Sequence, residues 1–342
     1  MKRLRVLVLM HEDSIPPDSL DGYDDKEMQQ WKTEYDVIAG LCDLGHEARP
    51  LGVTTDLGLI RRSILEWKPH VTFNLLEEFH GVGVYDQHVV SYLELMRQPF
   101  TGCNPRGLTL THDKPLMKQI LTYHRIPTPK FTVFPLGRKV IRSPRRLDFP
   151  LLVKSTIEDA SLGISQASVV HSNEKLVERA RFVHEQLHTD ALAEEYIEGR
   201  ELYVGVIGNQ RLQTFPIWEM SFSKMPDHVQ RIATARVKWD LDYQKKHGIK
   251  THAARDLPEG AGVNISKLCK RIYRALYLSG YARMDLRLTP DGRIYVLEAN
   301  ANPNLEFGED FAESAESIGV SFETLLQRII NLGLHYKAAW RE

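Results

Sequence analysis

Residues 281–300 limit the fold of this chain more than any other segment. Two runs of alternating polar and apolar residues flank Asp291 and Gly292, and an Asp-Gly pair in that setting indicates a β-hairpin with a two-residue loop. In that register Asp285 faces Glu298 and Arg283 faces Asn300. The alternation places these four polar residues on one face of the hairpin. The other face then holds Met284, Leu286, Leu288, Tyr295, Leu297 and Ala299.

The polar face of this hairpin is a candidate metal site. Two facing carboxylates repel each other unless a cation lies between them, and the side-chain oxygens of Asp, Glu and Asn suit Mg²⁺. We therefore predict Asp285, Glu298 and Asn300 as metal ligands. The alternative is a solvated hairpin face with an incidental acidic pair. A three-residue loop would change the register on which the prediction depends.

The composition is that of a globular protein with an ordinary core. The chain has 342 residues, of which 42% are hydrophobic and 26% charged, and 44 Lys+Arg against 45 Asp+Glu leave a net charge of −1. That balance argues against nucleic-acid binding. Three distant cysteines suit a reducing compartment, and the apolar run at residues 6–10 is too short for a signal peptide or a membrane span. We predict a cytoplasmic protein that binds neither nucleic acid nor membrane.

The first 110 residues alternate between strand and helix patterns, which favours a parallel sheet with helices on both faces. Strands are predicted at residues 4–10 and 71–76, and helices near 37–44, 60–67 and 89–96. The rest of the chain is a mixture of helices and strands. Its pattern predicts helices at 114–124, 174–187, 265–278 and 322–332. Strands are predicted at 151–154, 164–170, 191–196 and 201–207, and a polar segment lies near 223–260.

Three further segments suit nucleotide binding, although each also has an ordinary structural explanation. Lys154 ends an apolar strand before a turn of small residues, which can aim an ammonium and backbone amides at phosphates; a lysine beside an ordinary hairpin loop gives the same pattern. Residues 194–201 can offer backbone groups to a base and a carboxylate to ribose, or form a surface turn rich in Glu. Lys114 begins a helix, where an isolated lysine is usually solvated.

Taken in order, these segments resemble the ATP-grasp carboxylate–amine ligases, most closely the D-alanine–D-alanine ligase branch, over nearly the whole chain. The resemblance rests on residues 77–81, 93–102, 113–114, 153–163, 194–201, 283–285 and 297–303. It implies an α/β plus α+β fold: an N-terminal α/β domain with a parallel sheet (residues 1–110) and two α+β lobes that clamp ATP (residues 111–195 and 196–342). The last lobe is expected to carry the metal and substrate site.

The resemblance also implies how ATP is held. Lys114 and Lys154 are expected to contact its phosphates, and residues 158–163 to close over them with Ser161 near the transferred group. Four consecutive residues are expected to face adenine, and a fifth the ribose: Glu194, Glu195, Tyr196 and Ile197, then Glu201.

The expected reaction follows from the same resemblance. ATP converts a carboxylate into an acyl phosphate, and an amine then displaces phosphate to form an amide bond, on amino acids or short peptides. Asp285, Glu298 and Asn300 are expected to hold two Mg²⁺ ions, with Mn²⁺ as a substitute, and Arg283 to stabilise the charge that develops during acyl transfer. The partners are therefore a small carboxylate and a small amine. Members of this family often form homodimers.

Three segments depart from the pattern of the D-alanine ligases, and all of them lie where that family binds its substrates: residues 10–14, 157–160 and 243–247. In addition, Glu306, Glu309 and Asp310 follow the metal-binding strand where that family carries hydroxyl groups, which argues against a substrate carboxylate there. The alternative is that these carboxylates point to solvent. The alternatives are a ligase acting on the end of a larger peptide or protein, a true D-alanine–D-alanine ligase, and a catalytically silent nucleotide-binding protein. The intact Arg283 and metal-ligand set argues against the last.

Overall fold

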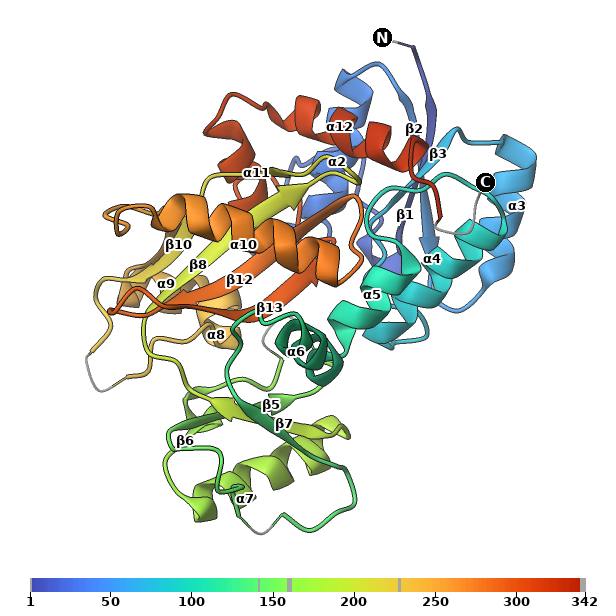
Figure 1. The fold of residues 1–342 in the computed structure, drawn as a ribbon. Coiled ribbons are helices and arrows are strands. Elements are labelled where there is room, and N and C mark those ends of the chain that lie inside the picture. Colours follow the sequence, from blue (N-terminus) through green and yellow to red (C-terminus); the bar gives the residue numbers. More distant parts are fainter. Residues whose placement is uncertain (1, 141, 159–161, 227–228, 339–342) are drawn as a thin grey trace.

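Three β-sheets organise the chain, as the computed structural model shows (Figure 1). It describes residues 2–140, 142–158, 162–226 and 229–338. The first sheet has the order β2-β1-β3, the second β4-β7-β5-β6, and the third β11-β10-β8-β12-β13 with β9 paired to β8. The first is parallel and the other two are antiparallel. This arrangement confirms the predicted α/β plus α+β class.

The central strand of the N-terminal sheet is buried on both faces. Its elements are β1 (Arg5–His11), β2 (Glu47–Val53), β3 (Val71–Asn74), the short α1 (Asp25–Met28), α2 (Lys32–Asp43), α3 (Leu57–Trp67) and α4 (Asp86–Leu95). Alternate residues of β1 belong to two different hydrophobic clusters, as expected of a central parallel strand. The final helix α12 (Phe322–Leu334) returns to pack against α2 and β3.

The central lobe is small and has a hydrophobic core of its own. It contains β4 (Phe131–Phe134), β5 (Leu151–Ser155), β6 (Val169–Val170), β7 (Ala191–Glu195) and α7 (Asn173–Phe182), which continues as a π-helix over Val183–Leu187. The strand predicted at residues 164–170 is reduced to two residues. A 3-10 turn over Gln166–Ser168 replaces its first part, because the Ser165 backbone N–H donates to Ser168 Oγ (3.0 Å) and closes the turn.

The third sheet forms the C-terminal lobe. It contains β8 (Arg200–Ile207), β9 (Gln213–Thr214), β10 (Trp218–Phe222), β11 (Ile249–Ala253), β12 (Tyr281–Leu288) and β13 (Ile294–Ala301), with α10 (Ala261–Ala275) and α11 (Asp310–Glu316). The predicted polar segment near 223–260 in fact holds α8 (Ala235–Trp239), α9 (Leu241–His247) and β11. Helices α5 (Pro105–His112) and α6 (Lys114–Tyr123) precede β4, the first strand of the central lobe.

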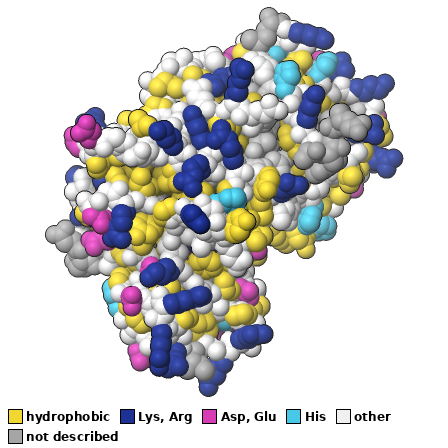
Figure 2. All heavy atoms as spheres, viewed as in Figure 1, with side chains coloured by type: hydrophobic (Ala, Val, Ile, Leu, Met, Phe, Trp, Pro, Cys, Tyr) yellow, Lys and Arg dark blue, Asp and Glu magenta, His cyan; other side chains and the backbone are white. Residues whose placement is uncertain are grey.

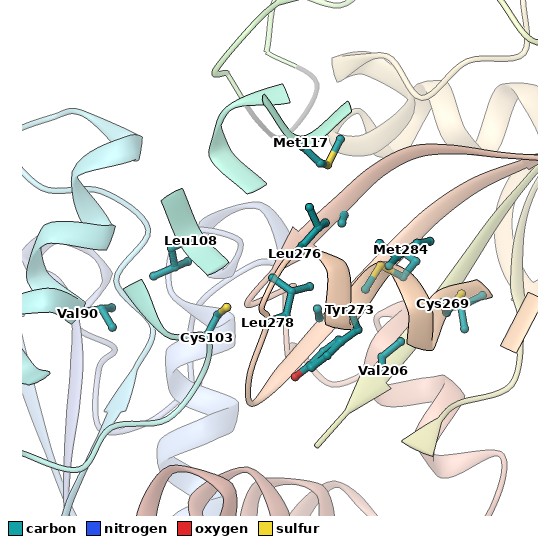
Figure 3. Packing of buried hydrophobic residues seen from close by; sticks show 14 of the residues in the cluster. Val90, Cys103, Leu108, Met117, Val206, Cys269, Tyr273, Leu276, Leu278 and Met284 are labelled. Carbon is teal, nitrogen blue, oxygen red and sulfur yellow. The ribbon is translucent and has the colours of Figure 1, made fainter. Parts of the chain in front are cut away.

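The N-terminal domain and the C-terminal lobe share one hydrophobic core. Figure 3 shows Val90, Cys103 and Leu108 from the first in the same cluster as Tyr273 and Met284 from the second. At their contact a Cβ on Gly280 (φ +70°) would lie against the backbone carbonyl of Gly102, closer than real Cβ atoms approach, so glycine is required there. From the three sheets we propose the limits 1–110, 111–195 and 196–342 for the three parts.

Charge is unevenly distributed on the surface. Figure 2 shows Lys and Arg side chains gathered in the middle of one face, over α10. The exposed residues of that helix include Lys267, Arg271 and Arg274. Because the net charge is close to zero, acidic residues elsewhere in the molecule balance this local excess of positive charge. Within the described ranges, no helix combines the length and the hydropathy needed to cross a bilayer.

Candidate active site

The β12–β13 pair places Asp285 opposite Glu298 and Arg283 opposite Asn300, as predicted. The loop and the strand pairing that produce this register differ from those predicted. The loop has three residues, 290–292, since the Thr289 backbone N–H donates to the Arg293 carbonyl (2.9 Å). This loop shifts the pairing by one residue, and a β-bulge at Leu297 shifts it back.

The same bulge changes the apolar face of the hairpin. Met284, Leu286, Leu288 and Ala299 are buried in the shared core, as predicted. Tyr295 and Leu297 were wrongly assigned to that face. Beyond the bulge, alternate residues change sides, so Val296 and Ile294 pack against the core in their place.

The Asp285 carboxylate lies at the centre of the polar face. Arg283 donates to it from Nε (2.8 Å) and Nη2 (3.0 Å), and Asn300 Nδ2 donates to its Oδ2 (2.9 Å). The third guanidinium nitrogen of Arg283 lies 2.9 Å from Asp310 Oδ2, and the guanidinium covers the Tyr203 ring at 4.7 Å. Burial raises the pKa of Asp285, although Arg283 opposes that shift. The structure thus brings together Arg283, Asp285 and Asn300.

Lys114 joins α6 to this face. Its ammonium lies 3.2 Å from Glu298 Oε1 and donates to the Glu158 carbonyl at 2.7 Å. Asp113 caps the helix by accepting from the Leu116 N–H (2.8 Å), which fixes the start of α6 and the direction of the Lys114 side chain. The alternative of a solvated lysine is wrong, because only 2% of Lys114 is exposed.

A second buried charge cluster lies beside the first. Glu194 on β7 is bound by Lys154 of β5 (3.0 Å) and by Lys118 of α6 (2.7 Å). Burial raises the pKa of the Glu194 carboxyl, but the two ammonium groups more than offset it and bring the pKa to about 2. Sequence reasoning missed Lys118. Its signal is the spacing of four from Lys114, which puts both lysines on one helix face.

Glu201 occupies a different environment from the one expected of a ribose ligand. Arg287 Nη2 lies 2.8 Å from its Oε2, and Tyr203 donates to its Oε1 at 2.9 Å. All three side chains are buried on the same face of the sheet as Asp285. Contact between Glu201 and ribose stays a prediction.

The remaining predicted residues lie at the crossing between β7 and β8. Glu195 pairs with Lys130 (3.1 Å). Tyr196 and Ile197 line a pocket of about 350 Å³ with the β12–β13 loop and Tyr295. Contact of these residues with adenine stays a prediction. Ser161 lies outside the described residues.

The donor set fits the predicted metal. Asp285, Glu298 and Asn300 offer two carboxylates and an amide from adjacent strands, which are hard oxygen donors of the kind that Mg²⁺ binds. Both carboxylates have cationic neighbours in the structure, Arg283 and Lys114. No cluster of three or more His, Cys, Asp or Glu suitable for a metal ion occurs among the described residues, so a metal here must use the Asn300 amide, water or a ligand oxygen as well.

The surroundings beyond Arg283 are acidic. Burial raises the pKa of Glu306, whereas the Glu309 side chain is exposed to solvent. Across from them on α2, burial and the charges of Glu77 and Glu306 raise the pKa of Glu34 to about 7. Lys32 supplies a positive charge nearby, 3.9 Å from Glu306, but it also binds Asp36 at 2.7 Å.

Comparison with known proteins gives a family and a fold. Residues 121–331 match the family described as D-ala D-ala ligase C-terminus. The uncharacterized protein y4sG of Sinorhizobium fredii is 30% identical over 303 residues, which are 86% of this chain and 85% of that protein. The D-alanine–D-alanine ligase of Bordetella petrii is 30% identical over 257 residues, covering 74% of this chain and 73% of the relative.

Solved structures share the arrangement of the three sheets. The D-alanine–D-alanine ligase of Bacillus anthracis, solved in complex with ATP, superposes with a TM-score of 0.73 at 23% identity and covers 97% of both chains. The Coxiella burnetii enzyme superposes with a TM-score of 0.70 at 16% identity, over 98% of this chain and 94% of that one. At these identities the likeness establishes the ATP-grasp fold.

Proposed function

This chain belongs to the D-ala D-ala ligase C-terminus family, and we propose that its site joins a carboxylate to an amine through an acyl phosphate. Membership makes it an ATP-dependent, ADP-forming ligase that forms an amide bond between amino acids. The observation that carries the proposal is the facing pair of Asp285 and Glu298, with Lys114 at 3.2 Å from Glu298. Such a set of charges suits a bound polyphosphate and its metal.

The residues of the chain contribute position and charge. When bound, ATP supplies the phosphoryl group that activates the carboxylate, and Mg²⁺ neutralises the phosphate oxygens. Lys114 and Lys154 hold ammonium groups at the boundary between the central and C-terminal lobes. Asp285, Glu298 and Asn300 hold two Mg²⁺ ions in this proposal.

Arg283 is the residue that stabilises developing negative charge. Its guanidinium is fixed by Asp285 on one side and Asp310 on the other, at 2.8 and 2.9 Å. A cation held in this way needs no reorganisation when charge develops beside it. The Tyr203 ring below the guanidinium further restricts its orientation.

We also propose that the amine substrate presents a cationic or amide group rather than a carboxylate to the acidic surroundings. Glu306 and Glu309 lie on the segment that follows the metal-binding strand, and Glu34 faces Glu306. A substrate carboxylate 4 Å from the half-buried Glu306 would cost about 4 kcal/mol at an effective dielectric constant of about 20. A pair of D-alanine molecules, the substrates named for the Bordetella relative, is therefore disfavoured.

The test is ADP release from ATP and Mg²⁺ across a panel of amino acids and dipeptides, with products identified by mass spectrometry. The panel contains lysine, arginine and ornithine, their neutral counterparts, and D-alanine alone. We expect turnover with a cationic or amide-bearing amine. Turnover with D-alanine near 1 s⁻¹, within the usual range for natural substrates, would instead favour the second candidate, a true D-alanine–D-alanine ligase. If no compound of the panel supports ADP release, the result would favour the end of a larger peptide or protein as the substrate.

Two further proposals concern the state of the protein. The cysteines Cys42, Cys103 and Cys269 are free thiols, which supports a cytoplasmic location. A homodimer is proposed from the resemblance to the ligase branch alone.

A further inference from the structure

One fully buried ammonium connects the two lobes of the site. Lys118 is 0% exposed. Its Nζ lies 2.7 Å from Glu194 Oε2 on β7 of the central lobe. The same Nζ donates to Thr128 Oγ1 at 2.9 Å and to the Leu297 carbonyl on β13 at 3.4 Å. Lys118 thus contacts β7, which carries the buried Glu194, and β13, which carries Glu298. We call the facing carboxylates Asp285 and Glu298 the metal pair.

The contact on β13 falls at the bulge. A bulge interrupts the ladder of backbone hydrogen bonds, so the polar groups there need other partners. The segment before β4 supplies them. The Val296 N–H donates to the Pro127 carbonyl (2.9 Å), and Thr128 Oγ1 donates to the Val296 carbonyl (3.0 Å). Lys118 donates to the third group at the bulge, the Leu297 carbonyl.

This bulge decides which residue faces Asp285. On its far side Leu286 pairs with Val296, and on its near side Asp285 pairs with Glu298. Without the extra residue, Leu297 would face Asp285 and the carboxylate of Glu298 would move to the other face of the sheet. Whatever holds the bulge therefore holds the metal pair in register.

Stability alone gives little reason for a lysine at this position. Burial lowers the pKa of Lys118, and well-packed apolar residues often replace a buried ion pair without loss of stability. The Lys118 ammonium adds a positive charge to the cluster, which an apolar residue could not do. With Lys118 and Lys154 against Glu194, this cluster carries one more positive than negative charge.

We propose that Lys118, with Thr128, is a positioning residue that fixes the β13 bulge and the Glu194 carboxylate together, and so aligns Glu298 with the Lys154 ammonium. This inference rests on the proposed function, in which nucleotide phosphates and metal bind between these groups. Lys118 acts through Glu194 and Leu297 and is not itself assigned a contact with substrate.

The experiment compares Lys118→Met and Thr128→Val with Thr128→Ser, which keeps the hydroxyl. Lys175→Met is the control, because Lys175 makes a salt bridge of the same length (2.7 Å) to Glu178 on the exposed face of α7. Three quantities are measured: ADP affinity without metal by calorimetry, Mn²⁺ affinity of the ADP complex by the electron paramagnetic resonance of free Mn²⁺, and the melting temperature. The values of kcat and KM for ATP complete the set.

The two variants are expected to differ. Lys118→Met should weaken both ADP and Mn²⁺ binding about tenfold, as for loss of a hydrogen bond to a charged group. Thr128→Val should weaken Mn²⁺ binding about threefold, as for loss of a neutral hydrogen bond, with ADP affinity unchanged. Thr128→Ser and Lys175→Met should behave as the wild type.

A folded Lys118→Met protein with wild-type affinity for ADP and Mn²⁺ overturns the proposal, even if its melting temperature falls. If Lys118→Met does not fold, the comparison of Thr128→Val with Thr128→Ser tests the proposal. Wild-type Mn²⁺ affinity in Thr128→Val then overturns it. Failure of the wild-type protein to bind ADP and Mn²⁺ would overturn the proposed function, whereas normal wild-type binding with unaffected variants overturns only this inference.

Discussion

The Lys114 ammonium lies 3.2 Å from the Glu298 carboxylate, and so the first turn of α6 is joined to β13, the strand that carries the proposed metal ligand Glu298. The same ammonium donates to the Glu158 carbonyl, at the start of the loop that follows β5. One lysine therefore links three segments that are distant in the sequence. Substitution at either end of this pair should be informative.

Replacement Glu298→Gln should leave a folded protein whose ADP formation falls at least about tenfold, since one electrostatic contact in a transition state is typically worth more than that. The amide keeps the shape of the side chain but removes the charge that faces Asp285. Steady-state ADP release and circular dichroism measure the two effects. Wild-type turnover in this variant would place the metal elsewhere.

Arg283→Lys should lower kcat about a hundredfold and leave ADP affinity nearly unchanged. Lysine keeps the positive charge but cannot bind Asp285 through two nitrogens while also reaching Asp310. Single-turnover kinetics and calorimetry with ADP separate these effects. An equal loss of ADP affinity would assign Arg283 to nucleotide binding instead.

The buried pair of Arg287 and Glu201 gives a stability prediction. Arg287→Met should lower the free energy of unfolding by about 3–5 kcal/mol, because Glu201 is left buried without its cation. The double variant with Glu201→Gln should recover part of that loss. Urea unfolding measures both. Arg293→Met is the matched control on the same hairpin, where the pair with Asp291 is exposed and little change is expected.

Glu34 gives a dependence of stability on pH. Burial, with Glu77 and Glu306 nearby, raises its pKa from 4.5 to about 7. The folded state therefore holds this proton more tightly than the unfolded state, and stability is lost as pH rises from about 4.5 to about 7, by at most about 3 kcal/mol. Glu34→Gln should then gain stability relative to the wild type across that window. Equal differences in unfolding free energy at the two ends of the window would contradict this.

Much of the site could be predicted from sequence because short spacings fix it. The alternation of β12 and β13 predicted which polar residues share a face, and the helix predicted to begin at Lys114 is α6. The prediction that Asp285 faces Glu298 was correct, but it assumed a two-residue loop without a bulge. In the structure a longer loop and a bulge offset each other. A bulge leaves no clear mark in an alternating pattern.

Other features depend on contacts that no local pattern shows. The strand β11 carries a mostly exposed sequence, so the sequence analysis gave only a polar segment near 223–260 and predicted no strand there. The pairing of Lys118 with Glu194 joins residues 76 positions apart, and it forms only once α6 packs against the sheet of the central lobe. Likewise, the partners of Glu201 come from its own strand and from β12, 86 residues away.

The core beneath the sheet of the central lobe is separate from the one that the N-terminal domain and the C-terminal lobe share, which also includes Met117 and Leu121 of α6. Two cooperative folding units are therefore expected within one chain, with the smaller one melting first. The proposed nucleotide site lies between them, with Lys154 and Glu194 on one unit and Glu298 on the other. Bound nucleotide stabilises both units at once, so it should draw two melting transitions together into one. The shape of a calorimetric trace, independent of any turnover, then reports whether the site is occupied.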